Sequence, residues 1–406
     1  MARPAPLPPF HVHGRVTGSR FADRADEVRR VVGVLEEPGA KLLVRGRRRM
    51  GKTSILEVAQ ARAMHRGTPV LYADLSTAQT LPEAATRLLI AANTALGRQW
   101  HEVLLDIARR AAQAITVSFG DDGRPQLGLV PERFQSPAHA PQALDVVLDA
   151  INTTARARRR PLGIILDEFQ ELTTAGGQSA AWTLRGVIQR HDAVSYVCAG
   201  SRRRLLDALV GRDGAFFKML DPPLDVGPID PAFLAVWIDS RLSKFRVAPQ
   251  PGVGARCVAL AGPCTLDVML LAREVYQRQA ASRAATVASV DEAFAVLVTL
   301  LSDGLRHQWD ETSPAQQQVL RAVAGASAGL TTGETTVAFG LGPSGSVMSA
   351  VRPLIERELL VREPRESPVA VGYTFDSPYM RGWVIRHALP DLGLQRPITA
   401  LPTTSP

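Results

Sequence analysis

The sequence is poor in cysteine, in lysine and in long apolar runs. Three cysteines in 406 residues, each in an apolar context, are too few for a disulfide framework and favour a reducing compartment. No stretch approaches the roughly 18 apolar residues that a membrane-spanning helix needs. The proline-rich start, residues 1–10, lacks the apolar core of a signal peptide. The sequence therefore predicts a cytoplasmic protein with no membrane partner.

Positive charge is nearly all arginine. The 47 basic residues include four lysines and outnumber 39 acidic residues, which gives a formal net charge of +8. Two interpretations stay open: a GC-rich genome that favours arginine codons, or a nucleic-acid partner attracted by basic surface. A content of 46% hydrophobic and 21% charged residues is typical of globular chains and excludes a disordered or fibrous one.

Short apolar strands alternate with amphipathic helices through the first 230 residues. The expected strands cover residues 41–44, 69–75, 162–166, 194–199 and 224–229. Strands separated by helices predict an α/β fold with a parallel sheet and crossover connections. Residues 115–130 alternate around Asp121-Asp122-Gly123, which predicts a hairpin inserted at the surface.

A phosphate-binding loop follows the first strand. Gly46-x4-Gly51-Lys52-Thr53 stands between a strand and a helix, the context that separates such a loop from an ordinary basic turn. We expect Lys52 to reach the β- and γ-phosphates of ATP and Thr53 to hold Mg²⁺ through its hydroxyl. The predicted nucleotide-binding residues of the loop are Gly46, Arg47, Arg48, Arg49, Met50, Gly51, Lys52, Thr53 and Ser54.

The strand over residues 162–166 ends in two carboxylates. An apolar strand followed by Asp167 places that side chain beside the Mg²⁺ shell, and Glu168 can act as the general base for the attacking water. A further strand, residues 69–75, is inserted between the two motifs. That insertion is typical of P-loop proteins with a catalytic Glu rather than of nucleotide kinases.

The strand over residues 194–199 ends in Gly200-Ser201, followed by Arg202–Arg204. Ser201 is placed to sense the γ-phosphate by a hydrogen bond, and one of the arginines can neutralise charge in the transition state. The alternative is a serine that caps a helix, followed by a solvated basic turn. Both interpretations stay open.

These motifs together resemble the archaeal-type ATPase family, in the signal-transduction (STAND) branch of P-loop ATPases and near the AAA+ origin-recognition ATPases. The segments that carry the resemblance are Phe21-Ala22-Asp23-Arg24-x-x-Glu27, Gly46–Ser54, Leu166–Leu172, Gly200-Ser201 and Phe375–Trp383. The resemblance implies a P-loop ATPase domain, a helical lid that closes over the nucleotide, and a winged-helix domain. It also implies that the segment from Phe21 to Arg24 contacts adenine.

The expected organisation has five parts: a flexible proline-rich arm (1–17), the ATPase domain (18–230), the helical lid (231–302), the winged-helix domain (303–390) and a disordered tail (391–406). In the winged-helix domain, helices are expected over 314–324, 332–339 and 344–359, followed by extended segments over 360–363 and 369–375.

Three functions fit this pattern. The first is a slowly hydrolysing ATPase switch that controls assembly, as a homo-oligomer in the ATP state, and binding of a protein partner. The second is a DNA-binding initiator or transposition-type regulatory ATPase, and the third is a scaffold that binds ATP without hydrolysis. Residues 303–390 hold eight arginines and nine acidic residues, 8 − 9 = −1. If duplex DNA binds, we therefore expect it at arginine clusters of the ATPase region: Arg47–Arg49, Arg202–Arg204 or, freest of the three, Arg156–Arg160.

Overall fold

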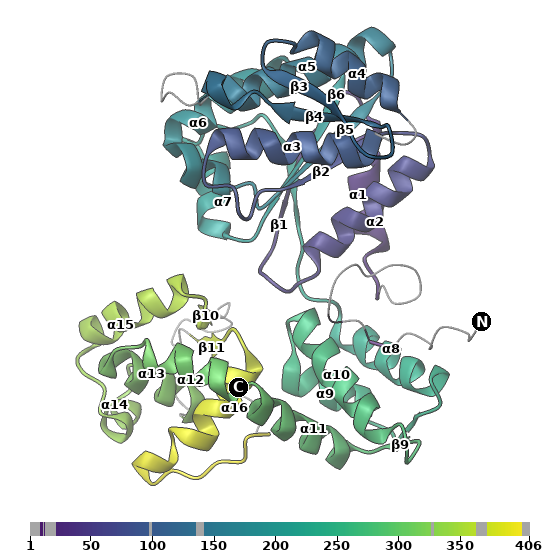
Figure 1. Cartoon of the computed structure of the whole chain (residues 1–406). Helices are drawn as coiled ribbons and strands as arrows, with labels where there is room; N and C mark the ends of the chain where they lie inside the picture. Colours follow the sequence, from purple (N-terminus) through teal and green to yellow (C-terminus); the bar gives the residue numbers. More distant parts are fainter. Residues whose placement is uncertain are drawn as a thin grey trace. The chain divides into compact units, whose positions relative to one another are not determined.

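The computed structural model describes residues 9–10, 12, 22–96, 100–134, 142–325, 329–362 and 372–399. The chain divides into two compact units (Figure 1). The first unit is Arg15–Gly227, and the second combines Met1–Gly14 with Pro228–Pro406. None of the helices in these described ranges is long and apolar enough to cross a membrane.

The first unit alternates strands and helices, as the sequence pattern predicts. Its elements are α1 (Ala25–Glu36), β1 (Lys41–Arg45), α2 (Lys52–His65), β2 (Val70–Asp74), α3 (Leu81–Leu96), α4 (His101–Arg110), β3 (Ile115–Phe119), β4 (Pro125–Leu129), the 3₁₀ helix η2 (Pro131–Phe134), α5 (Gln142–Arg158), β5 (Leu162–Asp167), α6 (Glu171–Arg190), β6 (Val194–Gly200), α7 (Arg203–Val210) and β7 (Asp221–Asp225).

Five of these strands form a parallel sheet in the order β2-β5-β6-β1-β7. In this order β6 separates the phosphate-loop strand β1 from β5, the strand that ends in Asp167. The inserted strand β2 lies at the edge, beside β5. Because all five strands run the same way, the loops after β1, β5 and β6 meet at one edge of the sheet.

Helices cover both faces of this sheet (Figure 1). On β5, Ile164 and Leu166 pack in one continuous core with side chains of α3, α5 and α6. Gly163, which points to the other face, lies against Leu35 of α1. Because β5 is buried on both faces of the sheet, it has no solvent-facing side, and its sequence is therefore a continuous apolar run.

The hairpin predicted over residues 115–130 is present as β3 and β4, paired antiparallel. It is held on α3, where Asn93 donates to Leu127 O at 2.9 Å and accepts from Leu127 N at 2.7 Å. The last strand of the sheet is shifted from its expected position, because β7 covers residues 221–225 rather than 224–229. Pro222 and Pro223 hid it from sequence analysis, since proline in a strand is tolerated mainly at a sheet edge, where β7 lies.

The second unit is mainly helical, and its short strands pair as β8 with β9 and β10 with β11. Its elements are α8 (Pro231–Lys244), β8 (Ala248–Pro249), α9 (Val253–Ala261), α10 (Thr265–Gln279), β9 (Ala284–Ala285), α11 (Val287–Leu300), α12 (Ser302–Asp310), α13 (Pro314–Gly325), α14 (Gly333–Phe339), α15 (Ser344–Glu356), β10 (Leu360–Arg362), β11 (Tyr373–Phe375), α16 (Pro378–His387) and the 3₁₀ helix η3 (Pro390–Leu392).

The expected order of three helices and a hairpin appears as α13, α14, α15 and the antiparallel pair β10–β11. Helix α16, which the sequence analysis did not single out, ties this group to the preceding helices. Tyr379 donates to Asp267 O of α10 at 2.7 Å, and Trp383 Nε1 donates to Ser302 Oγ of α12 at 3.0 Å. Residues on both sides of the expected border at 302/303 therefore belong to one compact unit.

Two terminal segments differ from expectation. Within the arm expected to be flexible, Phe10 is fully buried and packs edge-on against Trp237 of α8, while Pro9 O accepts a hydrogen bond from Arg241. Within the tail expected to be disordered, Asp391 pairs with Arg321 of α13 at 3.2 Å. The rest of the arm and residues 400–406 lie largely outside the described residues. Apolar burial and ion pairing hold these two segments.

Candidate functional site

The phosphate loop connects β1 to α2 and has the backbone that its glycines allow. A Cβ atom on Gly46 would lie 2.5 Å from Val226 O, so only glycine lets the two chain segments pass. Gly51 has φ of 89°, a left-handed conformation that glycine adopts without strain. Helix α2 begins at Lys52 directly after it, with Thr53 and Ser54 in its first turn. The loop thus delivers a helix amino terminus, where an anion is favoured.

Lys52 is turned into this loop. Its side chain is buried, and Nζ donates to Gly46 O at 2.8 Å and to Arg47 O at 2.9 Å. These carbonyls hold the ammonium group within the turn of the chain. The other predicted loop residues, Arg48, Arg49 and Met50, lie in the same turn, with Met50 buried beneath it.

Asp167 collects donors from three elements. Its Oδ2 atom accepts from Thr53 Oγ1 of α2 at 3.2 Å and from Tyr72 OH of β2 at 2.5 Å. Its Oδ1 atom accepts from the Glu168 backbone N–H at 3.0 Å. Burial raises the pKa of Asp167, and the hydrogen bonds oppose that rise. The two side chains predicted to hold the metal, Thr53 and Asp167, are therefore in direct contact.

Glu168 is held in place by the next strand. Its backbone has φ of 52°, and the following residue, Phe169, donates its N–H to Ala199 O of β6 at 2.7 Å. Ser201 Oγ donates to Glu168 Oε2 at 2.9 Å, and Gln170 Nε2 donates to the same oxygen. The structure thus places Ser201 beside the predicted base. The N-cap residue of α7 is Arg202, and its side chain makes no capping hydrogen bond.

Arg24, predicted to contact adenine, lies against the phosphate loop. It is buried, pairs with Glu27 at 2.9 Å and donates to Met50 O at 3.4 Å and to Gly227 O. Its Nε atom is buried and has no acceptor among the described residues. Phe21, the other predicted adenine contact, lies outside the described residues.

Sequence analysis missed two side chains at this site, Tyr72 and Gln170. Tyr72 is far from Asp167 along the chain and meets it because β2 and β5 are neighbours, with Asp74 opposite Asp167. A polar side chain in an otherwise apolar strand was the available signal. Gln170 is fully buried two residues after Glu168, and the corresponding signal was an amide side chain so close to the predicted base.

The donor set fits a magnesium–nucleotide complex. A hydroxyl and a carboxylate in contact are the oxygen ligands that Mg²⁺ takes, usually with waters and phosphate oxygens completing the shell. The ammonium group of Lys52 beside a helix amino terminus matches phosphate. Each of these groups stands at the carboxyl edge of the sheet, where ligands bind in open α/β sheets.

The arginine cluster that sequence analysis interpreted as freest is mostly committed to internal contacts. Arg156 pairs with Asp192 at 2.6 Å, and Arg158 pairs with Asp106 at 2.6 Å. Arg160 lies over the Trp100 ring, 5.4 Å from its centroid. The interpretation of Arg156–Arg160 as free basic surface is therefore wrong for Arg156 and Arg158, because acidic partners distant in sequence neutralise them. Arg160 keeps its charge, although its side chain is engaged by the Trp100 ring and by Gly67 O.

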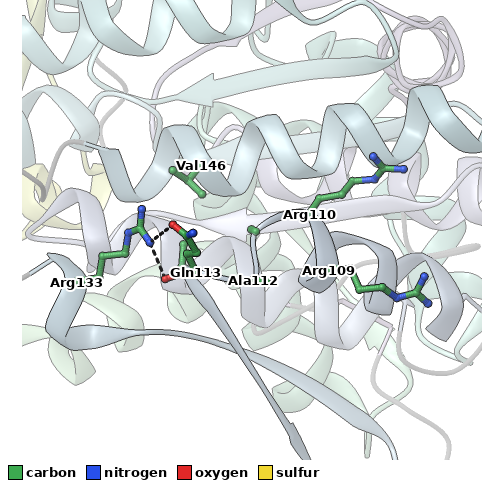
Figure 2. A pocket seen from close by; sticks show the side chains of 8 residues that line it. Arg109, Arg110, Ala112, Gln113, Arg133 and Val146 are labelled. Carbon is green, nitrogen blue, oxygen red and sulfur yellow. Dashed lines mark hydrogen bonds between the residues drawn. The ribbon is translucent and has the colours of Figure 1, made fainter.

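A pocket of about 330 Å³ lies away from the nucleotide residues (Figure 2). It is formed where α4 ends, with the turn from Ala111 to Ala114, Val146 of α5 and Arg133 of η2 on its walls. None of the residues predicted to bind nucleotide lines it. The pocket is therefore a separate feature of the first unit.

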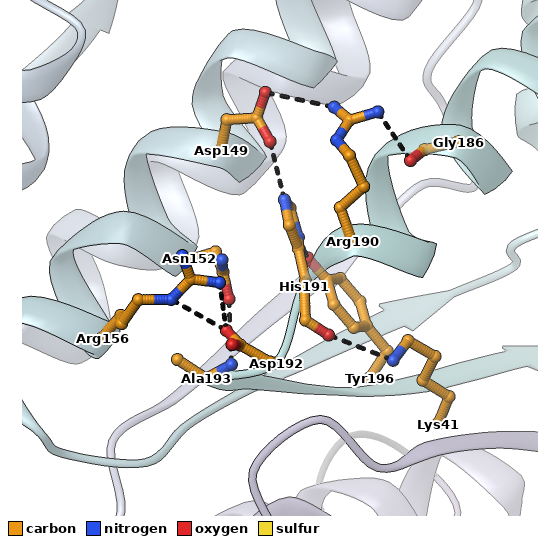
Figure 3. A network of polar contacts seen from close by, with 10 residues as sticks. All are labelled: Lys41, Asp149, Asn152, Arg156, Gly186, Arg190, His191, Asp192, Ala193 and Tyr196. Atoms are coloured by element: carbon orange, nitrogen blue, oxygen red, sulfur yellow. Dashed lines mark hydrogen bonds and ion pairs between the residues drawn. The ribbon is translucent and has the colours of Figure 1, made fainter.

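A polar network fastens the amino edge of the same sheet (Figure 3). His191 is buried, with Nδ1 2.6 Å from Tyr196 OH and Nε2 2.7 Å from Asp149 Oδ1. Burial lowers the pKa of His191 despite its carboxylate partner. Arg190 pairs with the other oxygen of Asp149 at 3.6 Å. This network joins α5, α6 and β6, and it lies at the edge opposite the phosphate loop.

Comparison with known proteins defines the fold. No protein-family model matches the chain, and no curated protein sequence matches it. A Walker-type ATPase of Pyrococcus abyssi superposes with a TM-score of 0.62 at 16% identity, over 93% of this chain and 99% of that one. The ORC2 protein of Aeropyrum pernix, solved as ADPNP–ADP complexes, gives 0.53 at 12% identity, over 92% and 96%. The chain has the fold of the archaeal ORC-like P-loop ATPases, as its motifs predict.

Proposed function

We propose that the protein binds Mg²⁺-ATP at the phosphate loop and hydrolyses it slowly to ADP and phosphate. The observation that carries this proposal is the convergence of Lys52, Thr53, Asp167, Glu168 and Ser201 at one edge of a parallel sheet. These side chains come from α2, the end of β5, the loop that follows β5 and the segment after β6. Their contacts form one connected polar cluster from Thr53 through Asp167 to Glu168 and Ser201.

In this proposal Lys52 and the backbone N–H groups of the loop bind the phosphates, and Thr53 and Asp167 hold the metal ion. Mg²⁺ supplies charge neutralisation of the phosphate oxygens when it is bound. We propose that Arg24, which is buried against Met50 O, and Phe21 contact the rest of the nucleotide.

Glu168 is the proposed general base, which accepts the proton of the attacking water at a carboxylate oxygen. In the described state Oε2 accepts hydrogen bonds from both Ser201 and Gln170. These two hydrogen bonds restrain the Glu168 side chain. This restraint is the physical reason for proposing slow, regulated turnover.

The proposed readout is conformational and of the STAND or AAA+ type. Residues 18–230 form the ATPase domain, residues 231–302 the lid and residues 303–390 a winged-helix domain. The nucleotide state then controls assembly and binding of a protein partner. Helix α16 supports joint movement of the last two parts, since Tyr379 and Trp383 bond to α10 and α12.

A DNA-binding role is the second candidate, and the charges of the chain weaken it. Residues 303–390 sum to −1, and α15, the candidate recognition helix, exposes Met348. In the basic run after β6, Arg202 pairs with Glu171 at 3.5 Å and Arg203 pairs with Asp207 at 3.6 Å. A protein that reads DNA concentrates unpaired positive charge on the reading face.

The test is binding of a fluorescent ATP analogue to the full-length parent and to Lys52→Ala. We expect tight, Mg²⁺-dependent binding by the parent and loss of it in the variant, because a charge-assisted contact to phosphate is removed. Lys244→Ala, an exposed lysine of the second unit, is the matched control. Equal affinity of all three proteins would contradict the assignment of the site.

The partner question is tested by measuring the size of the protein with ADP, with a non-hydrolysed ATP analogue, and with each plus duplex DNA. A larger assembly in the ATP state alone supports the switch. A complex that forms only with DNA supports the second candidate.

A further inference from the structure

A tyrosine of the edge strand β2 reaches the carboxylate that is proposed to hold the metal ion. Tyr72 OH donates to Asp167 Oδ2 at 2.5 Å, the same oxygen that Thr53 Oγ1 contacts at 3.2 Å. The neighbours of Tyr72 along β2, Leu71 and Ala73, are buried apolar residues. One hydroxyl within an apolar stretch of the strand is therefore directed at a residue of the nucleotide site.

The register of the sheet fixes this contact. Strand β2 runs parallel to β5, with Tyr72 opposite Ile165 and Asp74 opposite Asp167. Directly after the last pair, the Leu75 N–H donates to Asp167 O at 3.0 Å. The two backbones are thus joined at the point where β5 ends, and the phenol side chain spans the two-residue offset between Tyr72 and the carboxylate. A group carried by a strand is placed more precisely than one carried by a loop.

Three chain segments together orient the Asp167 carboxylate. Its Oδ2 atom accepts from the hydroxyls of Tyr72 and Thr53, and its Oδ1 atom accepts from the Glu168 backbone N–H at 3.0 Å. An ionised carboxylate offers about four lone-pair sites. Three donors therefore fix its direction and still leave room for a metal ion or for a water bound to the metal.

A plainer explanation is that a buried tyrosine hydroxyl takes any acceptor within reach. The division of tasks at Oδ2 argues for more than that. In the proposed function the Thr53 oxygen also binds the metal ion, whereas Tyr72 OH makes no other hydrogen bond among the described residues. Its contact is also the shorter of the two, at 2.5 Å against 3.2 Å. Tyr72 is therefore the hydroxyl whose one described partner is the metal-binding carboxylate.

We propose that Tyr72 is a positioning residue that holds the Asp167 carboxylate in the direction that Mg²⁺ needs. This inference rests on the proposed function. Tyr72 touches neither the metal ion nor the nucleotide in this proposal and acts through Asp167. Groups that orient a metal ligand typically change metal affinity by about 10–100-fold when they are removed.

The first test is Tyr72→Phe in the full chain, read by binding of a fluorescent ATP analogue as Mg²⁺ is titrated. We expect the Mg²⁺ concentration at half-effect to rise at least about tenfold. Affinity for the analogue without Mg²⁺ should stay unchanged, because the contacts of Lys52 to phosphate remain. Tyr196→Phe is the matched control: it also removes one buried hydroxyl, which lies 2.6 Å from His191 Nδ1 at the opposite edge of the sheet.

The second test asks whether Tyr72 acts through Asp167. The same Mg²⁺ titration is made with Asp167→Ala and with Tyr72→Phe/Asp167→Ala, which completes a double-mutant cycle. We expect Tyr72→Phe to change the half-effect concentration by less than about twofold once the carboxylate is absent, since independent sites agree within that range. A tenfold effect of Tyr72→Phe in both backgrounds would overturn the proposal.

The remaining outcomes separate this inference from the proposed function. If the parent binds no nucleotide, the proposed function fails. If the parent binds with Mg²⁺ dependence and Tyr72→Phe has the same dependence, only the inference about Tyr72 fails. If Tyr72→Phe weakens binding equally with and without Mg²⁺, the hydroxyl has a structural role alone, and the inference about Tyr72 is again overturned.

Discussion

The contact between Ser201 and Glu168 makes a quantitative prediction about turnover. Ser201 Oγ lies 2.9 Å from Glu168 Oε2, within hydrogen-bond distance of a carboxylate oxygen. If Ser201 acts by positioning Glu168, the two side chains form one unit. If Ser201 instead meets the γ-phosphate by itself, the two contributions are separate. A double-mutant cycle separates these cases.

The expected magnitudes follow from the chemistry of each side chain. Glu168→Gln removes the base and should lower kcat by about 10²–10⁴-fold while ATP binding persists. Ser201→Ala removes one hydrogen bond to a charged group, about 1.5–3 kcal/mol, which corresponds to about 10- to 150-fold in rate. The double variant should be no slower than Glu168→Gln alone, because Ser201 has nothing left to position.

The assay is single-turnover hydrolysis of labelled ATP with enzyme in excess, together with analogue affinity for each variant. Ser195→Ala is the control from the same strand, since Ser195 Oγ donates to Leu35 O at 3.0 Å, at the other end of β6. It should leave turnover unchanged. Multiplicative effects in the double variant would refute the reasoning, and unchanged hydrolysis in Glu168→Gln would place the base elsewhere.

Three further predictions concern stability. Burial and the charge of Asp149 raise the pKa of Asp145 to about 6, so ionisation of Asp145 destabilises the folded state. Asp145→Asn should therefore raise the melting temperature at pH 8. This gain in melting temperature should fade as the pH drops from about 6 to about 4. Arg158→Gln should lower stability by about 1 kcal/mol or less in urea titration, because its ion pair with Asp106 is removed, and it should leave duplex affinity unchanged. Phe10→Ala should cost about 3 kcal/mol or more, measured as a lower unfolding midpoint of the second unit.

Local sequence signals predicted the parts of the fold that depend on short segments. The phosphate loop could be placed because the strand, the glycines and the helix start are contiguous from Lys41 to Thr53. Asp167 could be placed because a fully buried strand of a parallel sheet reads as an uninterrupted apolar run. The strand over residues 221–225 is not such an apolar run, and its two prolines oppose a strand unless the strand lies at an edge.

Side chains that depend on strand order could not be placed in advance. Tyr72 and Asp167 meet because β2 pairs with β5, and nothing in either segment specifies that pairing. Ser201 meets Glu168 because β6 lies next to β5. The sequence analysis named Ser201 from its position after a strand, but its hydrogen-bond partner is a property of the sheet.

The arginine content shows that charge pairing, too, could not be predicted from local sequence. A net charge of +8 describes the whole chain, whereas binding depends on which charges lack a partner nearby. Arg156 is neutralised by Asp192, which follows it by 36 residues. The exposed Arg110 has no such partner among the described residues, although it belongs to no conspicuous run of basic residues. The density of arginine along the sequence is therefore a poor guide to basic surface here.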